Sequence, residues 1–356
     1  MPHEKEKKIL IMAFQGIGNI LLFTPTLEAL HQNYPQAKFT VIVGSETTRE
    51  ILERCPYIEK LMVYDAKSFW KTSFSKKIAF VRNLRNLKFD MTVSTFLEGG
   101  FKSSVLAFLT GAPVRVGYNI LGRGLFYTHR LNLIPNRHEK ELGLDLVRAI
   151  GGKVTDSGPT LWLEAPEGEW AKRFLEERKV LLDRPLVAIH PGGSPVHPGK
   201  RWDIDRFAGL SDKIIEKWNA YVLLVGGKVE QEMVPGLERL MKHRLLLAVD
   251  QPLRNTAALL EKCDLLVSND TGLSHVASAV GTPLISIFGP TNPWKNSPYG
   301  KESVVIRKDL PCSPCYEVRS GFRITCTHPD PFACLKMITV DEVLEEVSKS
   351  IKARNG

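Results

Sequence analysis

Short apolar runs alternate along the chain with longer stretches in which apolar residues recur every three or four positions. The runs in the first half read KILIMAF, KFTVIV, LMVY, MTVS and PVRVGY, and those in the second half read PLVAIH, YVLLVGG, LLLAV, DLLVSND and PLISIFG. Most of them are apolar at consecutive positions, which is typical of strands buried on both faces. Strands that alternate with helices predict parallel sheets covered by helices, an α/β fold.

The alternation is interrupted once, by a charged helical stretch, and then restarts. We therefore expect two doubly wound halves, since 356 residues are also more than one core usually serves. The predicted parts are a Rossmann-like domain over residues 1–165, a linker helix over 166–184, a second Rossmann-like domain over 185–338 and a C-terminal helix over 339–356. Ligands of such sheets bind at the carboxyl ends of the strands, so we expect a cleft between the domains to hold the site.

The stretch SNDTGLSHVASAVGTP follows the strand CDLLV and begins a helix at once. The apolar positions of this helix recur on one face: Leu273, Val276, Ala277 and Val280. Asp270 and Thr271 are ordinary helix-capping residues. A helix start also carries free N–H groups and a partial positive charge, and Gly272 would let a phosphate approach the backbone. Taken alone, the stretch leaves capping and phosphate binding both open.

Two further loops follow strands of the second half and should open on the same sheet edge. The loop HPGGSPVHPGKRW offers flexible backbone around Ser194 and a positive charge at Lys200, which suits phosphate. The loop GGKVEQE places Glu230 just inside a helix, where it could bind ribose hydroxyls or simply favour the helix dipole. Three such loops together indicate a nucleotide-diphosphate site. The sequence has neither a Walker A lysine motif nor a complete dinucleotide-binding G-x-G-x-x-G at the first turn.

The net charge of +9 is uneven, because residues 1–160 carry +8 and residues 161–356 carry +1. Between Asp65 and Asp90 there are seven basic residues and no acidic one, and four aromatic residues are interleaved among the basic ones: Phe69, Trp70, Phe74 and Phe80. This pattern suits an anionic partner, although a solvated helix face would look the same. No nucleic-acid-binding motif is present. No apolar run is long enough to span a membrane and the N-terminus does not read as a signal peptide, so we expect a cytoplasmic protein.

Four cysteines lie close together near the C-terminus, at Cys312, Cys315, Cys326 and Cys334. Two residues separate Cys312 from Cys315 in CSPC, which is the spacing of a metal-binding pair. Seven residues separate Cys326 from Cys334, so the second pair lacks this spacing. We expect the four to form one structural cluster. Structural zinc is the favoured interpretation, because a cytoplasmic location argues against disulfides. Disulfides, an iron–sulfur cluster and four reduced thiols are the alternatives.

The motifs in their order resemble glycosyltransferase family 9, the ADP-heptose:lipopolysaccharide heptosyltransferases. The resemblance extends from about Ile9 to Val347 and rests on GIGNILLFTPTLEALHQNYPQAKFTVIVG, LTGAPVRVGY, HPGGSPVHPGKRW, LLVGGKVEQE and SNDTGLSHVASAVGTPLISIFGPTNP. It implies a GT-B fold and an inverting transfer of heptose from ADP-heptose to the lipopolysaccharide inner core, on Kdo-lipid A or its heptosylated form. The implied acceptor is anionic and lipid-linked, which suits the basic first half and implies peripheral contact with the inner face of the inner membrane.

The resemblance also implies roles for individual residues. Lys200 would contact the donor phosphates and Glu230 the adenosine ribose, while Asp270 would bind the heptose. The remaining substrate-binding residues implied are Gly18, Ser194, Thr271, Gly272, Leu273 and His275. The helix start and Lys200 would stabilise the leaving ADP, so no cofactor is required for catalysis in this pattern.

One residue departs from the family pattern. The first loop reads Gly18-Asn19, where the family usually has Gly-Asp and the Asp is taken as the general base. An amide has no useful basicity. Another group therefore acts as the base, or Asn19 only positions the acceptor, or activity is low. Glu98, which follows the strand MTVS, is the candidate for the missing base. Alternative functions are a nucleotide-sugar epimerase of GT-B architecture and a nucleotide-sugar-binding protein with weak or no transferase activity.

Overall fold

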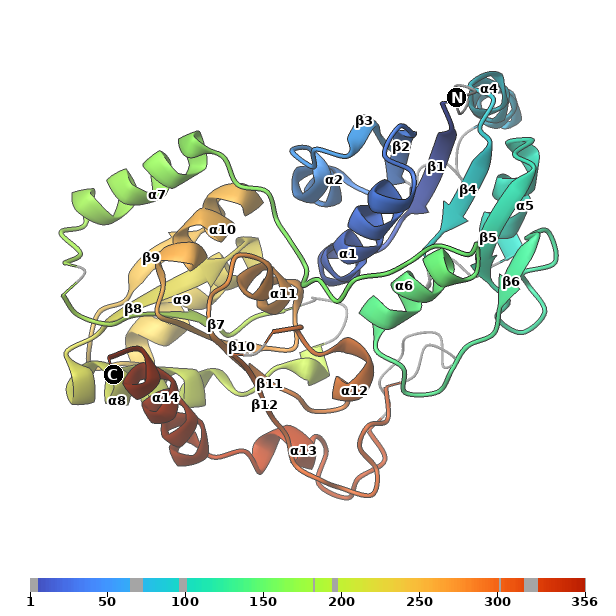
Figure 1. The fold of residues 1–356 in the computed structure, drawn as a ribbon. Coiled ribbons are helices and arrows are strands. Elements are labelled where there is room, and N and C mark those ends of the chain that lie inside the picture. Colours follow the sequence, from blue (N-terminus) through green and yellow to red (C-terminus); the bar gives the residue numbers. More distant parts are fainter. Residues whose placement is uncertain are drawn as a thin grey trace. The chain divides into compact units, whose positions relative to one another are not determined.

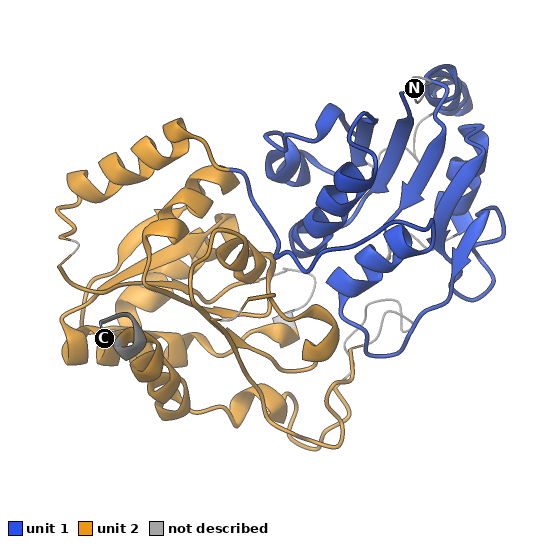
Figure 2. Ribbon diagram, in the orientation of Figure 1, with its two compact units in different colours: residues 1–162 blue, residues 163–356 orange. Residues whose placement is uncertain are grey.

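The computed structural model describes residues 6–64, 73–95, 101–181, 183–193, 198–300, 302–316 and 326–355 (Figure 1). The chain divides into two compact units, residues 1–162 and residues 163–356 (Figure 2). The division therefore lies three residues before the expected end of the first domain at residue 165. No helix in the described part of the chain is both long and apolar enough to cross a membrane.

The first unit contains the elements β1 (Lys8–Ala13), α1 (Ile17–Asn33), β2 (Lys38–Val43), α2 (Glu46–Leu52), β3 (Ile58–Val63), α4 (Phe74–Asn86), β4 (Met91–Ser94), α5 (Phe101–Leu109), β5 (Val114–Tyr118), β6 (His129–Leu131) and α6 (Glu139–Arg148). The helix α1 packs against α2 and α6, whereas α4 packs against α5. The α4–α5 side closes over a core formed by β1 and β2, with Leu10, Met12 and Ile42 packed beside Leu84 and Ala107.

The second unit contains α7 (Ala165–Glu177), β7 (Leu186–His190), a 3-10 turn (Pro198–Lys200), α8 (Ile204–Trp218), β8 (Tyr221–Gly226), α9 (Lys228–Leu240), β9 (Leu246–Val249), α10 (Leu253–Lys262), β10 (Leu265–Asn269), α11 (Gly272–Ala279), β11 (Leu284–Ile287), α12 (Pro293–Asn296), β12 (Ser303–Ile306), α13 (Ala333–Lys336) and α14 (Val340–Asn355). The expected linker helix corresponds to α7, which packs against α10. An ion pair of 2.5 Å between Arg254 and Glu167 joins these two helices.

The two units share one topology. Within the described residues each has a six-stranded sheet, in the orders β3-β2-β1-β4-β5-β6 and β12-β11-β10-β7-β8-β9, and the strands pair in parallel. The strand order reverses beside the first strand of each sheet, between β1 and β4 and between β7 and β10. This is the doubly wound nucleotide-binding order, whose ligands bind outside the strand ends at the reversal. The α/β prediction with two Rossmann-like domains of the GT-B type is confirmed.

Two strands at sheet edges were not expected from the sequence. β6 has only three residues and lies in the stretch LGRGLFYTHR, which reads as a basic loop. β12 forms an edge of the second sheet, beside β11. Both are short, with three and four residues, whereas the edge strands β3 and β9 overlap the apolar runs LMVY and LLLAV and were predicted. Central strands such as β7 and β10 are buried at every position, and their continuous apolar runs predict them clearly.

Candidate active site

The loops after β7 and β10 meet at the reversal point of the second sheet, and Asn269 fixes them to each other. This fully buried residue ends β10. Its side-chain amide donates hydrogen bonds to the carbonyls of Pro191 (2.7 Å) and Gly192 (3.0 Å). Its side-chain oxygen accepts a bond of 2.9 Å from the backbone N–H of Trp202. Both ends of the glycine-containing loop are thereby held against the start of α11.

The start of α11 is open to an anion. Thr271 is the cap residue, but its side chain accepts no hydrogen bond from the first-turn amides. The Thr271 hydroxyl is itself buried and has no hydrogen-bond partner among the described atoms. Ser274 holds the turn, because its hydroxyl donates to the carbonyl of Asn269 at 3.0 Å. The structure therefore disfavours the capping interpretation and leaves N–H groups of a helix start for a ligand.

Lys200 lies at this helix start. Its ammonium forms an ion pair of 2.7 Å with Asp270, the residue that links β10 to α11. Asp270 is only 8% exposed. The ring of Tyr316 lies 5.6 Å from the same ammonium. A lysine ammonium and the positive end of a helix thus lie close together, an arrangement that is suited to an anionic ligand such as a diphosphate.

Glu230 is buried between two glycine-containing loops. It accepts a 2.7 Å hydrogen bond from the backbone N–H of Gly227, so the helix-start interpretation of this residue is realised in the structure. A Cβ atom at Gly192 would lie 1.6 Å from the Glu230 carboxylate, and one at Gly226 would lie 2.3 Å from its side chain. Both positions therefore need glycine. Whether the carboxylate also binds ribose stays a prediction.

His190, the last residue of β7, was not singled out from the sequence. Its Nδ1 atom lies 3.0 Å from the carbonyl of Val225 and 3.8 Å from Glu230. Burial lowers the pKa of the His190 imidazole, which favours a neutral ring that donates from Nδ1 to the carbonyl. A polar residue that ends an apolar strand was the available signal.

In the first unit, Asn19 lies in the first turn of α1, after Gly18, at the carboxyl end of β1. Its side-chain amide donates a hydrogen bond to the carboxylate of Glu139, the first residue of α6. A carboxylate therefore does lie beside the position at which the sequence has an amide. The sequence does not reveal Glu139, because 120 positions separate the two residues.

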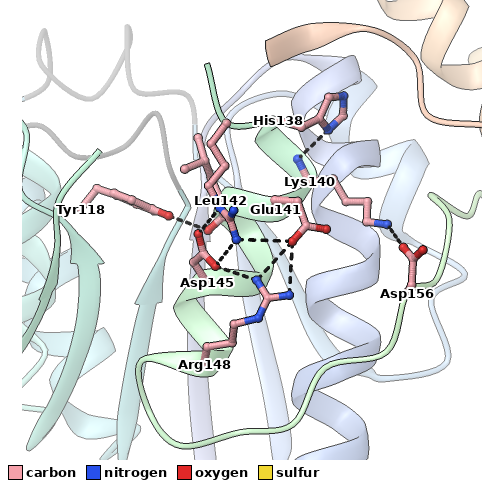
Figure 3. Close-up of polar contacts among 9 residues, drawn as sticks. Tyr118, His138, Lys140, Glu141, Leu142, Asp145, Arg148 and Asp156 are labelled. Atoms are coloured by element: carbon pink, nitrogen blue, oxygen red, sulfur yellow. Dashed lines mark hydrogen bonds and ion pairs between the residues drawn. The ribbon is translucent and has the colours of Figure 1, made fainter. Parts of the chain in front are cut away.

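A polar network holds α6 so that Glu139 keeps its place (Figure 3). The hydroxyl of Tyr118 donates to the carbonyl of Leu142 at 2.9 Å. Asp145 accepts hydrogen bonds from Arg148 at 2.6 Å and from Arg137 at 2.5 and 2.8 Å. At the start of the helix the backbone N–H of Lys140 donates to the imidazole of His138, and the Lys140 ammonium pairs with Asp156. The helix start is thus fixed from several sides.

Not every predicted site residue can be placed. Ser194 and Glu98 lie outside the described residues. Lys200, Asp270, Thr271 and Gly272 come together at the start of α11. Leu273 and His275 follow in the same helix and are buried.

The four C-terminal cysteines surround one small hollow, which is lined by Cys312, Cys315, Cys326 and Cys334. All six cysteines of the chain are described and are free thiols. The backbone N–H of Phe332 donates to the sulfur of Cys326 at 3.2 Å, and burial raises the pKa of Cys315 and of Cys334. No group of three or more His, Cys, Asp or Glu side chains in the described residues is arranged to hold a metal ion. The zinc site stays a prediction.

Two doubly wound sheets, with a helix start at the reversal point of the second, have the GT-B architecture. The family model of glycosyltransferase family 9 (heptosyltransferase) matches residues 77–323. The chain belongs to this family.

Similar proteins agree with this assignment. Lipooligosaccharide heptosyltransferase 2 of Haemophilus ducreyi is 26% identical and covers 96% of this chain and 99% of its own length. A family 9 glycosyltransferase structure from Veillonella parvula superposes with a TM-score of 0.84 at 23% identity, covering 98% of both chains. The ADP-heptose lipopolysaccharide heptosyltransferase II structure from Escherichia coli gives a TM-score of 0.77 at 21% identity, covering 98% of this chain and all of the other.

Proposed function

We propose that the protein transfers heptose from ADP-heptose to the lipopolysaccharide inner core with inversion at the anomeric carbon. The observation that carries the proposal is the open start of α11 with Lys200 and Asp270 beside it. The pyrophosphate of ADP-heptose is dianionic and gains a further negative charge as ADP leaves, and a helix start with a lysine is suited to stabilise that charge. The names of the similar proteins support heptose as the sugar and ADP as the nucleotide.

In this mechanism the diphosphate accepts hydrogen bonds from the backbone amides of Gly272 and Leu273 and from the Thr271 hydroxyl, which lacks a partner among the described atoms. The Lys200 ammonium contacts both the Asp270 carboxylate and the phosphates. Asp270, freed in part from the lysine, accepts hydrogen bonds from heptose hydroxyls. His275 lies one turn into the helix beside the diphosphate, and Glu230 binds the ribose.

Acceptor activation is assigned to the first unit. As the acceptor hydroxyl attacks the anomeric carbon, a new carbon–oxygen bond forms, the bond to ADP breaks, and the hydroxyl proton moves to a base. We assign this base to Glu139, with Asn19 holding its carboxylate through the side-chain amide. Glu98 remains the alternative base suggested by the sequence. Gly18 allows the acceptor to approach the helix start.

The acceptor is an anionic, lipid-linked inner core, and the second heptosyl transfer is the favoured reaction. Two of the similar proteins are named heptosyltransferase 2 and heptosyltransferase II, which supports this choice. The positive charge of residues 1–160 suits such an acceptor. The enzyme would then work in the cytoplasm at the inner face of the inner membrane.

No cofactor takes part in the proposed chemistry, but we propose a structural zinc ion at the four C-terminal cysteines. Thiolates are preferred zinc ligands, and four of them line one hollow. Binding would require their side chains to turn toward a common point. The ion would join the loop after β12 to α13.

The test is product analysis with purified enzyme, ADP-heptose and two acceptors, Kdo-lipid A and heptosyl-Kdo-lipid A. The proposal expects release of ADP that depends on an acceptor and addition of one heptose, faster on the heptosylated acceptor. ADP-heptose that is converted to another nucleotide sugar without acceptor would instead support an epimerase. Donor binding without turnover on either acceptor would support a binding protein.

A further inference from the structure

The first unit has a large apolar hollow, and the residues that line it have no role in the proposed transfer mechanism. It measures about 580 Å³ and lies between α4 and α5. Its apolar walls come from Phe74, Ile78 and Val81 of α4 and from Val105, Leu106 and Leu109 of α5. Phe14 and Tyr64, which follow β1 and β3, also line it.

The hollow exists because α4 has two apolar faces and only one is covered. Leu84 is buried in the core, and Phe80 stacks on Tyr64 with ring centroids 4.2 Å apart, so this face fixes the helix to the unit. Phe74, Ile78 and Val81 follow one another at a spacing of four and three residues and form the other face. Phe74 is 77% exposed and Ile78 is 50% exposed. Apolar side chains this exposed on one face mark a contact surface.

Among the described residues, every charged side chain that lines the hollow is basic. Four basic residues line it together with the apolar walls: Lys77, Arg82, Arg85 and Lys102. None of the described residues that line it is acidic. Long basic side chains at the rim of an apolar surface suit a partner with an apolar interior and anionic head groups.

The apolar surface also continues beyond the hollow. α5 carries two further exposed aromatic residues, Phe101 and Phe108, and both rings contact Phe126, at 5.8 and 5.2 Å between centroids. Of the twelve large apolar side chains that are exposed in the described residues, eight lie between Phe74 and Ile134. Exposed apolar side chains on both α4 and α5, outside as well as inside the hollow, favour a bilayer over the acyl chain of one bound lipid.

We propose that the α4–α5 surface docks the enzyme on an anionic phospholipid bilayer, with one lipid acyl chain entering the hollow and Lys77, Arg82 and Lys102 contacting head-group phosphates. The inference rests on the proposed function for its setting, since a lipid-linked acceptor is reached at a membrane. Docking on α4 and α5 keeps the enzyme at the surface where its acceptor is embedded.

The experiment measures vesicle sedimentation of the full chain with phosphatidylcholine vesicles, with and without phosphatidylglycerol. The parent protein should bind the anionic vesicles and bind neutral ones much more weakly. Phe74→Asp/Ile78→Asp removes the apolar contact and Lys77→Glu/Arg82→Glu reverses two charges. Each should weaken binding to anionic vesicles by roughly tenfold or more. Leu240→Asp, at an exposed leucine of the second unit, is the matched control and should bind like the parent.

A second readout separates docking from catalysis and from folding. Transfer to a fully deacylated acceptor in solution, and the thermal unfolding temperature, should stay close to the parent for all variants. Unchanged vesicle binding by both double variants overturns the proposal. If the double variants bind vesicles normally but have a raised KM for the lipid-linked acceptor in detergent, the hollow holds the acyl chain of the acceptor instead. If the double variants lose self-association that the parent shows, the surface is an interface between copies of the chain. If no acceptor is glycosylated at all, the proposed function fails while the sedimentation result still decides the docking surface.

Discussion

The ammonium of Lys200 pairs with Asp270 in the structure, and in the proposed mechanism it also contacts the diphosphate of the donor. The ion pair of 2.7 Å holds a carboxylate that is 8% exposed, so it satisfies a charge that would be costly to bury alone. The sequence suggested Lys200 as a phosphate ligand and Asp270 as a sugar ligand. Their contact links the two roles, because a phosphate that draws the lysine away leaves Asp270 ready to accept sugar hydroxyls.

Lys200→Met should weaken ADP binding by roughly ten- to hundredfold, since a charge-assisted contact to phosphate contributes about 1.5–3 kcal/mol. It should also lower stability by about 1–3 kcal/mol, because Asp270 loses its counter-ion. Calorimetry with ADP and urea unfolding measure the two effects. Adding Asp270→Asn should restore stability but not ADP affinity, and Lys213→Met, at an exposed pair with Asp341, should change neither. Parent-like ADP affinity in Lys200→Met would exclude this loop from the diphosphate site.

The contact between Asn19 and Glu139 changes what is expected of the residue that departs from the family pattern. From the sequence alone, restoring a carboxylate by Asn19→Asp should raise turnover. In the structure that carboxylate would lie in contact with the one on Glu139. Two carboxylates that close cannot both be ionised near neutral pH, so the pair would share a proton and lose basicity. We therefore expect Asn19→Asp to slow the enzyme.

Glu139→Gln should lower kcat by about 10²- to 10⁴-fold with little change in ADP-heptose affinity, as removal of a general base does. It should also abolish the acidic limb of the pH–rate profile. The exchanged pair Asn19→Asp/Glu139→Gln should recover part of the loss, because it returns a carboxylate to the same place. Glu28→Gln, at a residue of α1 outside the network that holds α6, is the control. A Glu139→Gln enzyme with parent kcat would return the assignment to Glu98 or another group.

At the scale of elements, the loops of the second unit depend on hydrogen bonds that the sequence does not reveal. SNDTGLSH and HPGGSPVHPGKRW were recognisable as loops at strand ends, because the strands before them are apolar at consecutive positions and a helix pattern follows. Nothing local shows that Asn269 joins them, since its partners are 67 to 78 positions away. The short strands β6 and β12 were missed, whereas the strands that overlap the apolar runs were predicted.

Asn269→Ala should lower the free energy of unfolding by about 2–4 kcal/mol, because it leaves the buried N–H of Trp202 and two carbonyls without their partner. It should also weaken ADP binding, since the loop that carries Lys200 would no longer be held at α11. Urea unfolding and calorimetry on the same preparation test both effects. Normal stability would show that water replaces these bonds, and normal ADP affinity would show that the loop position does not depend on them.

The cysteine-lined segment should bind about one zinc ion per chain, provided that the protein is purified without chelators. Elemental analysis gives the metal content and a thiol titration gives the number of accessible cysteines. Cys312→Ser/Cys315→Ser should remove the metal and lower the unfolding temperature. Cys55→Ser/Cys263→Ser, at the two buried cysteines away from the hollow, should keep the metal. Protein without metal but with four titratable thiols in this segment would contradict the zinc site.

At the scale of the whole molecule, charge divides the chain as the fold does. Residues 1–160 carry +8 and residues 161–356 carry +1, while the units divide at residue 162. The unit with the anion site at α11 is thus nearly neutral, and the unit with the apolar hollow is strongly basic. A local cluster of charged and N–H groups is enough to bind a small nucleotide, whereas positive charge spread over a whole unit attracts a large anionic surface. The sequence is enough to show that the charge is uneven, but only the structure places the basic residues around an apolar hollow.

The two kinds of binding should respond differently to salt. Raising ionic strength from 0.05 to 0.3 M shortens the screening length from roughly 14 to about 6 Å. That screens the exposed basic residues of α4 and α5 far more than the partly buried contact at Lys200. We expect KM for a lipid-linked acceptor in anionic vesicles to rise by roughly tenfold, while the ADP dissociation constant changes by about twofold or less. With a deacylated acceptor in solution the rise should be smaller, because fewer anionic groups are engaged. If KM for the lipid-linked acceptor did not change with salt, the positive charge of the first unit would have no part in acceptor encounter, and the bilayer contact would rest on the apolar surface alone.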